Sequence, residues 1–119
     1  MVQDNPKIIL EYVKNAAIAT LTDEKILEET DIQAIETTII PLIEQAPAIN
    51  LVLDFANVQF LSSAVLGLLI RISKKVYESN GQLRLCNINK KIFQIFTITR
   101  LDKIFEIFED RQSALDSLE

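Results

Sequence analysis

The sequence contains no histidine, and this absence excludes several kinds of chemistry. Without histidine the chain cannot build a Ser-His-Asp or Cys-His nucleophilic site, nor a metal site with imidazole ligands. The single cysteine, Cys86, cannot form an internal disulfide or supply the several thiolates of a zinc site. The only glycines are Gly67 and Gly81, which also excludes a glycine-rich phosphate-binding loop.

Catalysis by carboxylates is not excluded in this way, because the chain contains 17 Asp and Glu residues. No spacing among them marks the dedicated pair that acid–base catalysis by two carboxylates requires. We therefore expect a protein that is not an enzyme and that needs no cofactor and no metal.

The chain carries a formal net charge of −5 and has no cluster of basic residues. An acidic surface repels phosphate groups, so we expect no binding to nucleic acid or to an anionic membrane. No apolar run reaches the roughly 20 residues of a membrane span. The first ten residues, MVQDNPKIIL, lack the basic and apolar regions of a signal peptide. These features, together with the unpaired Cys86, predict a soluble, cytoplasmic protein.

Length and composition predict one domain over residues 1–119. Hydrophobic residues make up 49% of the chain and charged residues 24%, which is typical of a globular protein with a packed core. The scarcity of glycine and proline, with 2 and 3 copies, argues against long unstructured loops.

The first half of the chain predicts two strands, a polar loop and a helix. The strands cover residues 7–13 and 16–21, with Lys14-Asn15 as the turn between them. The polar stretch 22–31 is predicted to be a loop. Apolar residues then recur at helical spacing, at Ile32, Ile35, Ile39, Leu42 and Ile43.

Local signals set the expected limits of that helix. Asp31 is the predicted N-cap, because a short acidic side chain there accepts a hydrogen bond from the first turn. We expect a kink at Pro41, which lacks the backbone N–H that a helix interior uses. Pro47 marks the exit from the helix.

The second half begins with a βαβ unit. Residues 51–55 form a short apolar run typical of a strand buried on both faces, and helical periodicity follows over residues 64–79. Asn80-Gly81 ends this helix, with Gly81 in the usual C-terminal position, and a second strand covers residues 82–88. Such a unit predicts a parallel pair of strands.

A helix over residues 90–97, a short strand or extended turn over 103–108 and a helix over 110–118 complete the chain. The fold class is therefore α/β, a single domain with a mixed, mostly parallel sheet and helices packed against it.

Two adjacent serines, Ser62 and Ser63, stand between strand 51–55 and helix 64–79. A serine at a helix start often caps one of the backbone N–H groups that lack a partner there. The same helix end also favours an anion, so a phosphate on a serine would be tolerated. That phosphate would add about −1.5 to −2 charge units to an apolar surface. The residues alone leave both interpretations open.

The helix after the serines carries more apolar residues than one packing face needs. Its core stripe consists of Val65, Leu68, Leu69, Ile72 and Val76. A second apolar row beside this stripe contains Leu66, Ile70 and Tyr77. Either a neighbouring helix covers the second row, or part of it is exposed for a partner.

Two further residues near the serines have predicted structural roles. Asp54 ends the strand at 51–55, and its carboxylate is expected to bond the following turn or to orient the serines. Cys86 lies on the predicted strand 82–88 and is expected to be a small core residue, because a redox sensor needs an exposed thiol of low pKa.

The stretch LVLDFANVQFLSSAVLGLL, residues 51–69, resembles the core motif of STAS domains of the bacterial anti-sigma factor antagonist type. Shared features are a buried strand that ends in Asp, a short turn, a small polar pair and a helix with Leu-Gly. The downstream stretch GQLRLCNINKKIFQIFTITRLDKIFEIFED continues the resemblance, which covers residues 48–118 well. Ser62 stands where the family often has Asp, and Val65 where it usually has Gly.

The resemblance implies a partner switch. Such antagonists bind an anti-sigma factor that is also a serine kinase of the GHKL ATPase type. Phosphorylation of a serine at the helix start, which matches Ser63, abolishes binding, and a PP2C-like phosphatase restores it. The implied partner-binding residues are Ser62, Ser63, Leu66, Ile70 and Asn57, with Asp54 in support. The loop from Asp23 to Lys25 is expected to lie near the serines.

One alternative has no phosphorylation. The chain would then be a STAS scaffold subunit of a larger assembly, or a STAS module associated with a transporter.

Overall fold

The computed structural model describes residues 7–13 and 15–118. Two earlier predictions fall on residues outside this description. The segment without signal-peptide features includes residues 1–6, and the expected turn includes Lys14. The strands are β1 (Ile8–Val13), β2 (Ala16–Leu21), β3 (Lys25–Ile26), β4 (Asn50–Asp54), β5 (Phe60–Leu61), β6 (Gln82–Cys86) and β7 (Glu106–Phe108). The helices are α1 (Glu29–Gln45), α2 (Ser63–Glu78), α3 (Lys90–Ile98), the short 3₁₀ helix η1 (Leu101–Lys103) and α4 (Arg111–Asp116).

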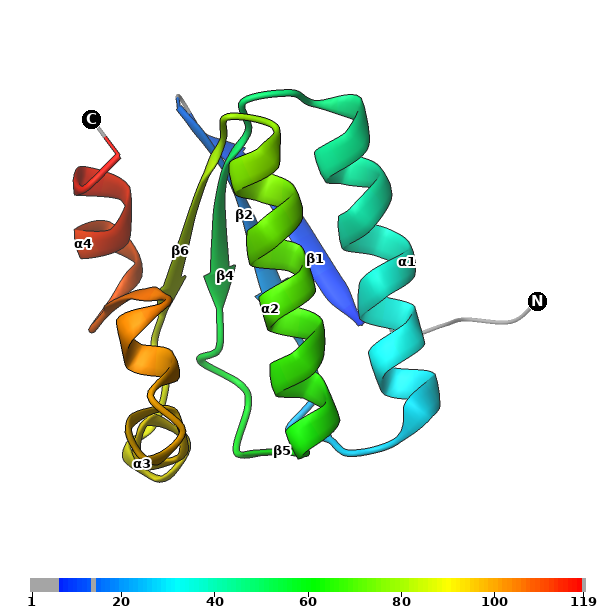
Figure 1. Cartoon of the computed structure of the whole chain (residues 1–119), viewed down its shortest axis with the longest axis vertical. Coiled ribbons are helices and arrows are strands. Elements are labelled where there is room, and N and C mark those ends of the chain that lie inside the picture. The colour runs from blue at the N-terminus through cyan, green and yellow to red at the C-terminus, as the bar shows by residue number, and fades with distance from the viewer. Residues whose placement is uncertain (1–6, 14, 119) are drawn as a thin grey trace.

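The main sheet has the strand order β1-β2-β4-β6-β7 (Figure 1). Only β1 runs antiparallel to its neighbour, and β2, β4, β6 and β7 pair in parallel. The segment from β4 through α2 to β6 is the predicted βαβ unit, in which Leu53 pairs with Leu85. The mixed, mostly parallel sheet is thus confirmed.

Helices cover the two faces of the sheet unequally. In Figure 1, α1 and α2 lie side by side in front of the sheet, whereas α4 lies on the left. The larger core cluster joins α1 and α2 to the sheet through residues such as Ile39, Leu53 and Leu68. The smaller cluster lies on the opposite face of the sheet, where Ala114 of α4 packs with Ile18 and Val52. Alternation of side chains along each strand separates the two clusters.

Helix α1 begins earlier than the sequence predicted. Its N-cap is Glu28, whereas Asp31 lies three residues inside the helix and accepts hydrogen bonds at Oδ2 from the backbone N–H groups of Glu28 and Leu27. The bond from Glu28 is the main reason why the pKa of Asp31 is lowered, with a contribution from Lys7. The expected N-cap was wrong, because the Asp31 carboxylate lies inside the first turn and accepts hydrogen bonds from N–H groups that precede the helix. The helix continues through Pro41 to Gln45.

The polar stretch 22–31 is more than a loop. Within it β3 pairs in parallel with β5, so that Lys25 lies opposite Phe60 and Ile26 opposite Leu61. Sequence periodicity did not predict these strands, because two residues are too few to show an alternation. This small second sheet joins the segment before α1 to the segment before α2.

The end of α2 corrects the expected role of Gly81. Asn80, with φ of 67°, adopts the left-handed conformation after the helix, and its N–H donates to the carbonyl of Tyr77. The N–H of Gly81 donates to the carbonyl of Val76 at 2.9 Å, which completes a Schellman motif. Gly81 itself has no positive φ. It is required for space, because a Cβ there would collide with the carbonyl oxygen of Ile49.

Replacing Gly81 by Ala should therefore lower the free energy of unfolding by roughly 1–3 kcal/mol, because backbone atoms of Ile49 cannot move aside. Gly67→Ala is the matched control. A Cβ at Gly67, inside α2, meets no atom within 4 Å, so this change should stabilise the protein by about 0.5–1 kcal/mol. Urea unfolding of both variants checks the prediction, and equal effects would contradict it.

Cys86 is fully buried in the smaller core cluster, as the sequence predicted. Burial raises the pKa of its thiol to about 12, and the negative charge of Asp54 contributes in the same direction. A thiol in this environment is a poor nucleophile at neutral pH.

We predict that a thiol reagent such as iodoacetamide leaves Cys86 unmodified in the folded protein and modifies it fully in urea. Intact mass after each treatment is the measurement. Complete labelling under native conditions, at the rate of a free thiol, would show that Cys86 is not part of the core.

Candidate functional site

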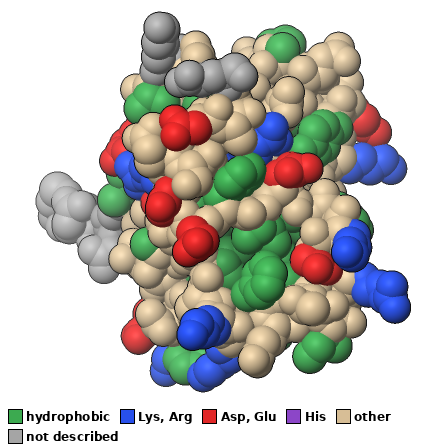
Figure 2. Space-filling model, turned by 90° about the vertical axis from the view of Figure 1, so that its left-hand side faces the viewer, with side chains coloured by type: hydrophobic (Ala, Val, Ile, Leu, Met, Phe, Trp, Pro, Cys, Tyr) green, Lys and Arg blue, Asp and Glu red, His purple; other side chains and the backbone are tan. Residues whose placement is uncertain are grey.

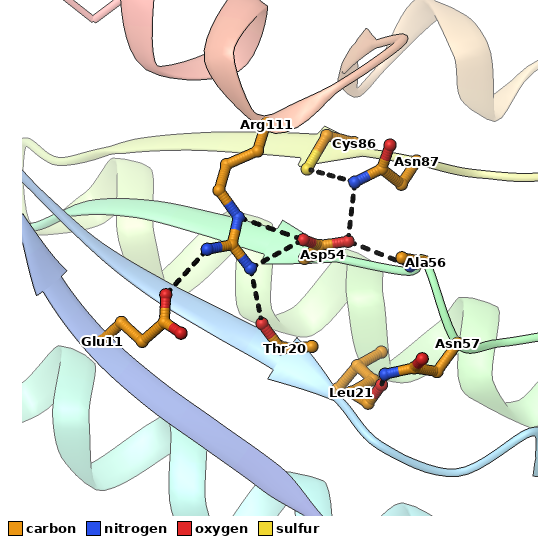
Figure 3. A network of polar contacts seen from close by, with 9 residues as sticks. All are labelled: Glu11, Thr20, Leu21, Asp54, Ala56, Asn57, Cys86, Asn87 and Arg111. Carbon is orange, nitrogen blue, oxygen red and sulfur yellow. Dashed lines mark hydrogen bonds and ion pairs between the residues drawn. The ribbon is translucent and has the colours of Figure 1, made fainter.

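The predicted site residues gather around the segment 55–63, which leads from the end of β4 to the start of α2 and is called the serine loop below. Asp54, the last residue of β4, is only 3% exposed. Its Oδ1 atom accepts a hydrogen bond of 2.9 Å from the backbone N–H of Ala56 (Figure 3). The predicted bond from Asp54 to the following turn is thus confirmed, and it fixes the direction in which the serine loop leaves the sheet.

The same carboxylate holds two other parts of the chain (Figure 3). The side-chain amide of Asn87, just after β6, donates to Oδ1 at 2.9 Å. Asn87 has a positive φ of 59°, a left-handed conformation that Asn tolerates better than most residues. Arg111 of α4 donates to Oδ2 through Nη2 at 2.9 Å and through Nε at 3.2 Å. One buried carboxylate therefore connects the serine loop, β6 and α4.

Arg111 also reaches the far edge of the sheet. It donates to Glu11 Oε1 of β1 at 2.7 Å and to Thr20 Oγ1 of β2 at 3.1 Å. The sequence analysis did not identify Arg111, which is 57 residues away from Asp54. A usable signal did exist, because an acidic residue at the end of a buried strand requires a positive partner somewhere in the fold.

Further hydrogen bonds fasten the serine loop along its length. Asn89, the N-cap of α3, accepts from the N–H of Ile92 and donates to the carbonyl of Val58 at 3.2 Å. Asn57, which is exposed, donates to the carbonyl of Leu21 at 3.3 Å. These bonds hold the loop to α3 on one side and to β2 on the other.

The loop at residues 23–25 lies beside the serine loop, as predicted. The carbonyl of Glu24 accepts hydrogen bonds from the N–H groups of Gln59 and Phe60, at 2.8 and 3.1 Å. The N–H of Ser62 then donates to the carbonyl of Ile26 at 3.0 Å. Pairing of β3 with β5 thus places the end of the serine loop against the segment before α1.

The two serines have different environments. Ser62 is the N-cap residue of α2 by its backbone, with an extended conformation and a carbonyl that accepts from the N–H of Val65. Its hydroxyl, however, makes no capping bond and is buried without a hydrogen-bond partner among the described residues. Ser63 is the first residue of α2 and is exposed. Capping by a serine hydroxyl is therefore not what this helix start uses.

The N-terminus of α2 is the positive end of its helix dipole. The first turn contains no acidic side chain of its own that would offset this charge. Added negative charge on Ser63 would thus lie at the favourable end of the helix.

The second apolar row of α2 is partly covered and partly exposed. Leu66 is 7% exposed and belongs to the main core cluster. Ile70 and Tyr77 are 41% and 44% exposed. Of the predicted partner-binding residues, Asn57 and the two serines therefore lie together in the serine loop. Leu66 belongs to the core, and Ile70 lies about two turns after Ser63 along α2.

Two hollows flank α3. The smaller has a volume of about 310 Å³ and lies between β3, β5 and α3, directly before the serines in the chain. The larger, of about 550 Å³, lies between the other side of α3 and β7, and its walls include Ile88, Phe93 and Phe108. Figure 2 views the molecule from the side of α3 and α4, where hydrophobic side chains gather between acidic ones.

Within residues 7–13 and 15–118 the structure contains no group of three or more side chains placed to hold a metal ion. None of the helices in this part of the chain is long and apolar enough to cross a membrane.

Replacement of Arg111 by Gln should leave the carboxylate of Asp54 buried without a cation. We expect the free energy of unfolding to fall by about 2 kcal/mol, less than for a fully buried pair because the Arg111 side chain is 35% exposed. Arg71→Gln, which breaks the exposed pair with Glu36, is the control and should cost less than about 0.5 kcal/mol. Urea unfolding measures both variants. Equal losses in the free energy of unfolding would contradict the contribution to stability predicted for the Arg111–Asp54 contact.

Comparison with known proteins agrees with this architecture. The sequence profile of the STAS domain family matches residues 10–114. The anti-sigma F factor antagonist of Paenibacillus polymyxa is 24% identical over 115 residues, which cover 97% of each chain. A STAS domain protein from Planctomyces limnophilus, solved as an anti-sigma-factor antagonist structure, superposes with a TM-score of 0.84 at 20% identity over 94% of this chain and 97% of that one.

A second similar structure is the phosphorylated form of the Bacillus cell fate determinant SpoIIAA. Its TM-score is 0.73 at 18% identity, over 94% of this chain and 99% of that one. The family profile covers nearly all of the strands and helices described above, and relatives named anti-sigma factor antagonists match at full length. The chain therefore belongs to the STAS domain family.

Proposed function

We propose that this protein is an anti-sigma factor antagonist whose binding is switched by phosphorylation of Ser63. In its unphosphorylated form it binds an anti-sigma factor that is a serine kinase of the GHKL type, and a PP2C-like phosphatase reverses the modification. The observation that carries the proposal is the exposed Ser63 at the start of α2, at the end of a loop fastened to β2, β3 and α3. Relatives named anti-sigma factor antagonists support the general role.

The position of Ser63 suits a switch that leaves the fold intact. Its hydroxyl is on the surface, so a kinase can transfer the γ-phosphoryl group of ATP to the oxygen while the hydroxyl loses its proton and ADP leaves. The phosphate would lie at the positive end of α2, where no acidic side chain of the first turn opposes it. Ser62 is the poorer acceptor, because its hydroxyl is buried.

The proposed binding surface combines polar and apolar residues around Ser63. Asn57 and Ser62 belong to the serine loop, Leu66 anchors the first turn of α2 in the core, and Ile70 offers exposed apolar area on α2. A partner that buries this surface would have to desolvate a phosphate of about −1.5 to −2 charge units on Ser63. Phosphorylation therefore releases the partner without unfolding the antagonist.

We predict that Ser63→Asp weakens binding to the cognate serine-kinase anti-sigma factor by about 100-fold or more, because one carboxylate is left unpaired in the interface. The thermal unfolding midpoint should change little, since Ser63 is exposed. Calorimetric titration and a thermal melt measure the two quantities.

Ser63→Ala is the matched control, because it removes the acceptor hydroxyl without adding charge. It should bind the anti-sigma factor about as tightly as the wild type and accept no phosphoryl group from it. If Ser63→Asp binds as tightly as the wild type, the switch is wrong and a STAS scaffold without phosphorylation becomes the better account.

A further inference from the structure

The smaller hollow beside the serine loop is lined by apolar residues together with two lysines. It is a groove between β3, β5 and the first two turns of α3, with an apolar base and two lysines at its border. Its lining residues are Lys25, Leu27, Gln59, Phe60, Leu61, Lys91, Ile92 and Ile95. Leu27 and Phe60 are 49% and 40% exposed, so this apolar area is open to solvent.

The two lysines are held near one aromatic ring. The ammonium group of Lys91 lies 4.7 Å from the centre of the Phe60 ring, and that of Lys25 lies 5.9 Å from it. Both distances are within the range of a cation–π interaction. The lysines come from different elements, β3 and α3, so the ring of Phe60 brings together two positive charges that the sequence separates by 66 positions.

These charges have no anionic partner within the described part of the chain. The ion pairs there use Lys7, Arg71, Lys75 and Arg111, whereas neither Lys25 nor Lys91 takes part in one. Two unpaired ammonium groups that line one groove attract an anionic group to it. The groove is thus a local positive site on a chain with a net charge of −5.

The geometry points to a groove that receives an acidic, apolar segment of the protein partner, with carboxylate side chains on Lys25 and Lys91 and an apolar side chain against Phe60 and Ile95. This inference rests on the proposed function, and it adds the chemistry of the partner segment. Charge complementarity of this kind sets partner choice and the rate of association more than it sets affinity.

The position of the groove also explains how a phosphate on Ser63 would weaken the binding of the partner segment. β5, which contributes Phe60 and Leu61 to the groove, leads directly into Ser62 and Ser63. A segment in the groove would therefore run past the start of α2. Carboxylates of that segment would be repelled by the phosphate, in addition to the cost of burying it.

The first test needs no knowledge of the partner. The probe is the peptide acetyl-Glu-Leu-Phe-Leu-Glu-amide, and its control is the same peptide with Gln in place of each Glu. Titration into the isotope-labelled protein should shift the backbone amide signals of Phe60, Lys91, Ile92 and Ile95 with the Glu peptide only. Shifts of equal size with the Gln peptide, or shifts confined to other residues, would overturn the inference.

The second test uses the anti-sigma factor. The double variant Lys25→Gln/Lys91→Gln should slow association by about tenfold at low ionic strength, and the difference should shrink as salt is added. The control is Lys74→Gln/Lys103→Gln, which removes the same charge from exposed positions outside the groove and should change the rate less than about twofold.

The two proposals fail in different ways in this assay. If Ser63→Asp abolishes binding while the groove variant binds at the wild-type rate at every salt concentration, the groove inference is wrong and the switch stands. If Ser63→Asp binds normally while the groove variant associates slowly, the groove is a docking site and the phosphorylation switch is wrong. Equal slowing by the groove variant and its control would also reject the groove.

Discussion

The buried carboxylate of Asp54 is the contact on which the arrangement of the site depends. One of its oxygens holds the backbone of Ala56 and the side chain of Asn87, and the other is bound by Arg111. A charged group with so little exposure needs all of these partners, because each bond lost would leave part of the charge unsatisfied. Asp54 consequently helps to position three parts of the chain: the start of the serine loop, the residue after β6, and α4.

This arrangement separates the stability of the fold from the chemistry of the proposed switch. The contacts that fix the serine loop are made by backbone groups, by the buried or half-buried side chains of Asp54, Asn87, Asn89 and Arg111, and by the exposed side chain of Asn57. Ser63 takes part in none of them and faces solvent. A modification of Ser63 therefore changes the charge that a partner meets and leaves the supports of the loop in place. A charge added to Ser63 would therefore not disturb the packing of the core beneath the serine loop.

Much of the fold could be predicted from the sequence, for identifiable reasons. The apolar run at β4 and the helical periodicity of α2 are long enough to be unambiguous, and together they specified the parallel pairing of β4 with β6. The position of Ser63 at the start of α2 followed from the same pattern, and the family resemblance is the basis of the role proposed for it. Cys86 was placed correctly because a lone cysteine in an apolar strand is usually a core residue.

The remaining features depend on contacts that no local pattern encodes. The pairing of β3 with β5, the bond from Arg111 to Asp54 and the two lysines around Phe60 all join residues that are distant in the chain. Helix ends were also misjudged, since Asp31 acts from within the first turn of α1 and Asn80, not Gly81, adopts the left-handed conformation. Close approach of Gly81 to Ile49 is visible only in three dimensions.

The central claim is that Ser63 carries the switch, and the most direct test is the modification state of the protein taken from its native cells. Intact mass followed by phosphopeptide mapping should reveal a species with one phosphoryl group, located on Ser63, whose fraction changes with growth or stress conditions. A protein that stays unmodified under all of these conditions, or that carries its phosphoryl group at another residue, would contradict the account.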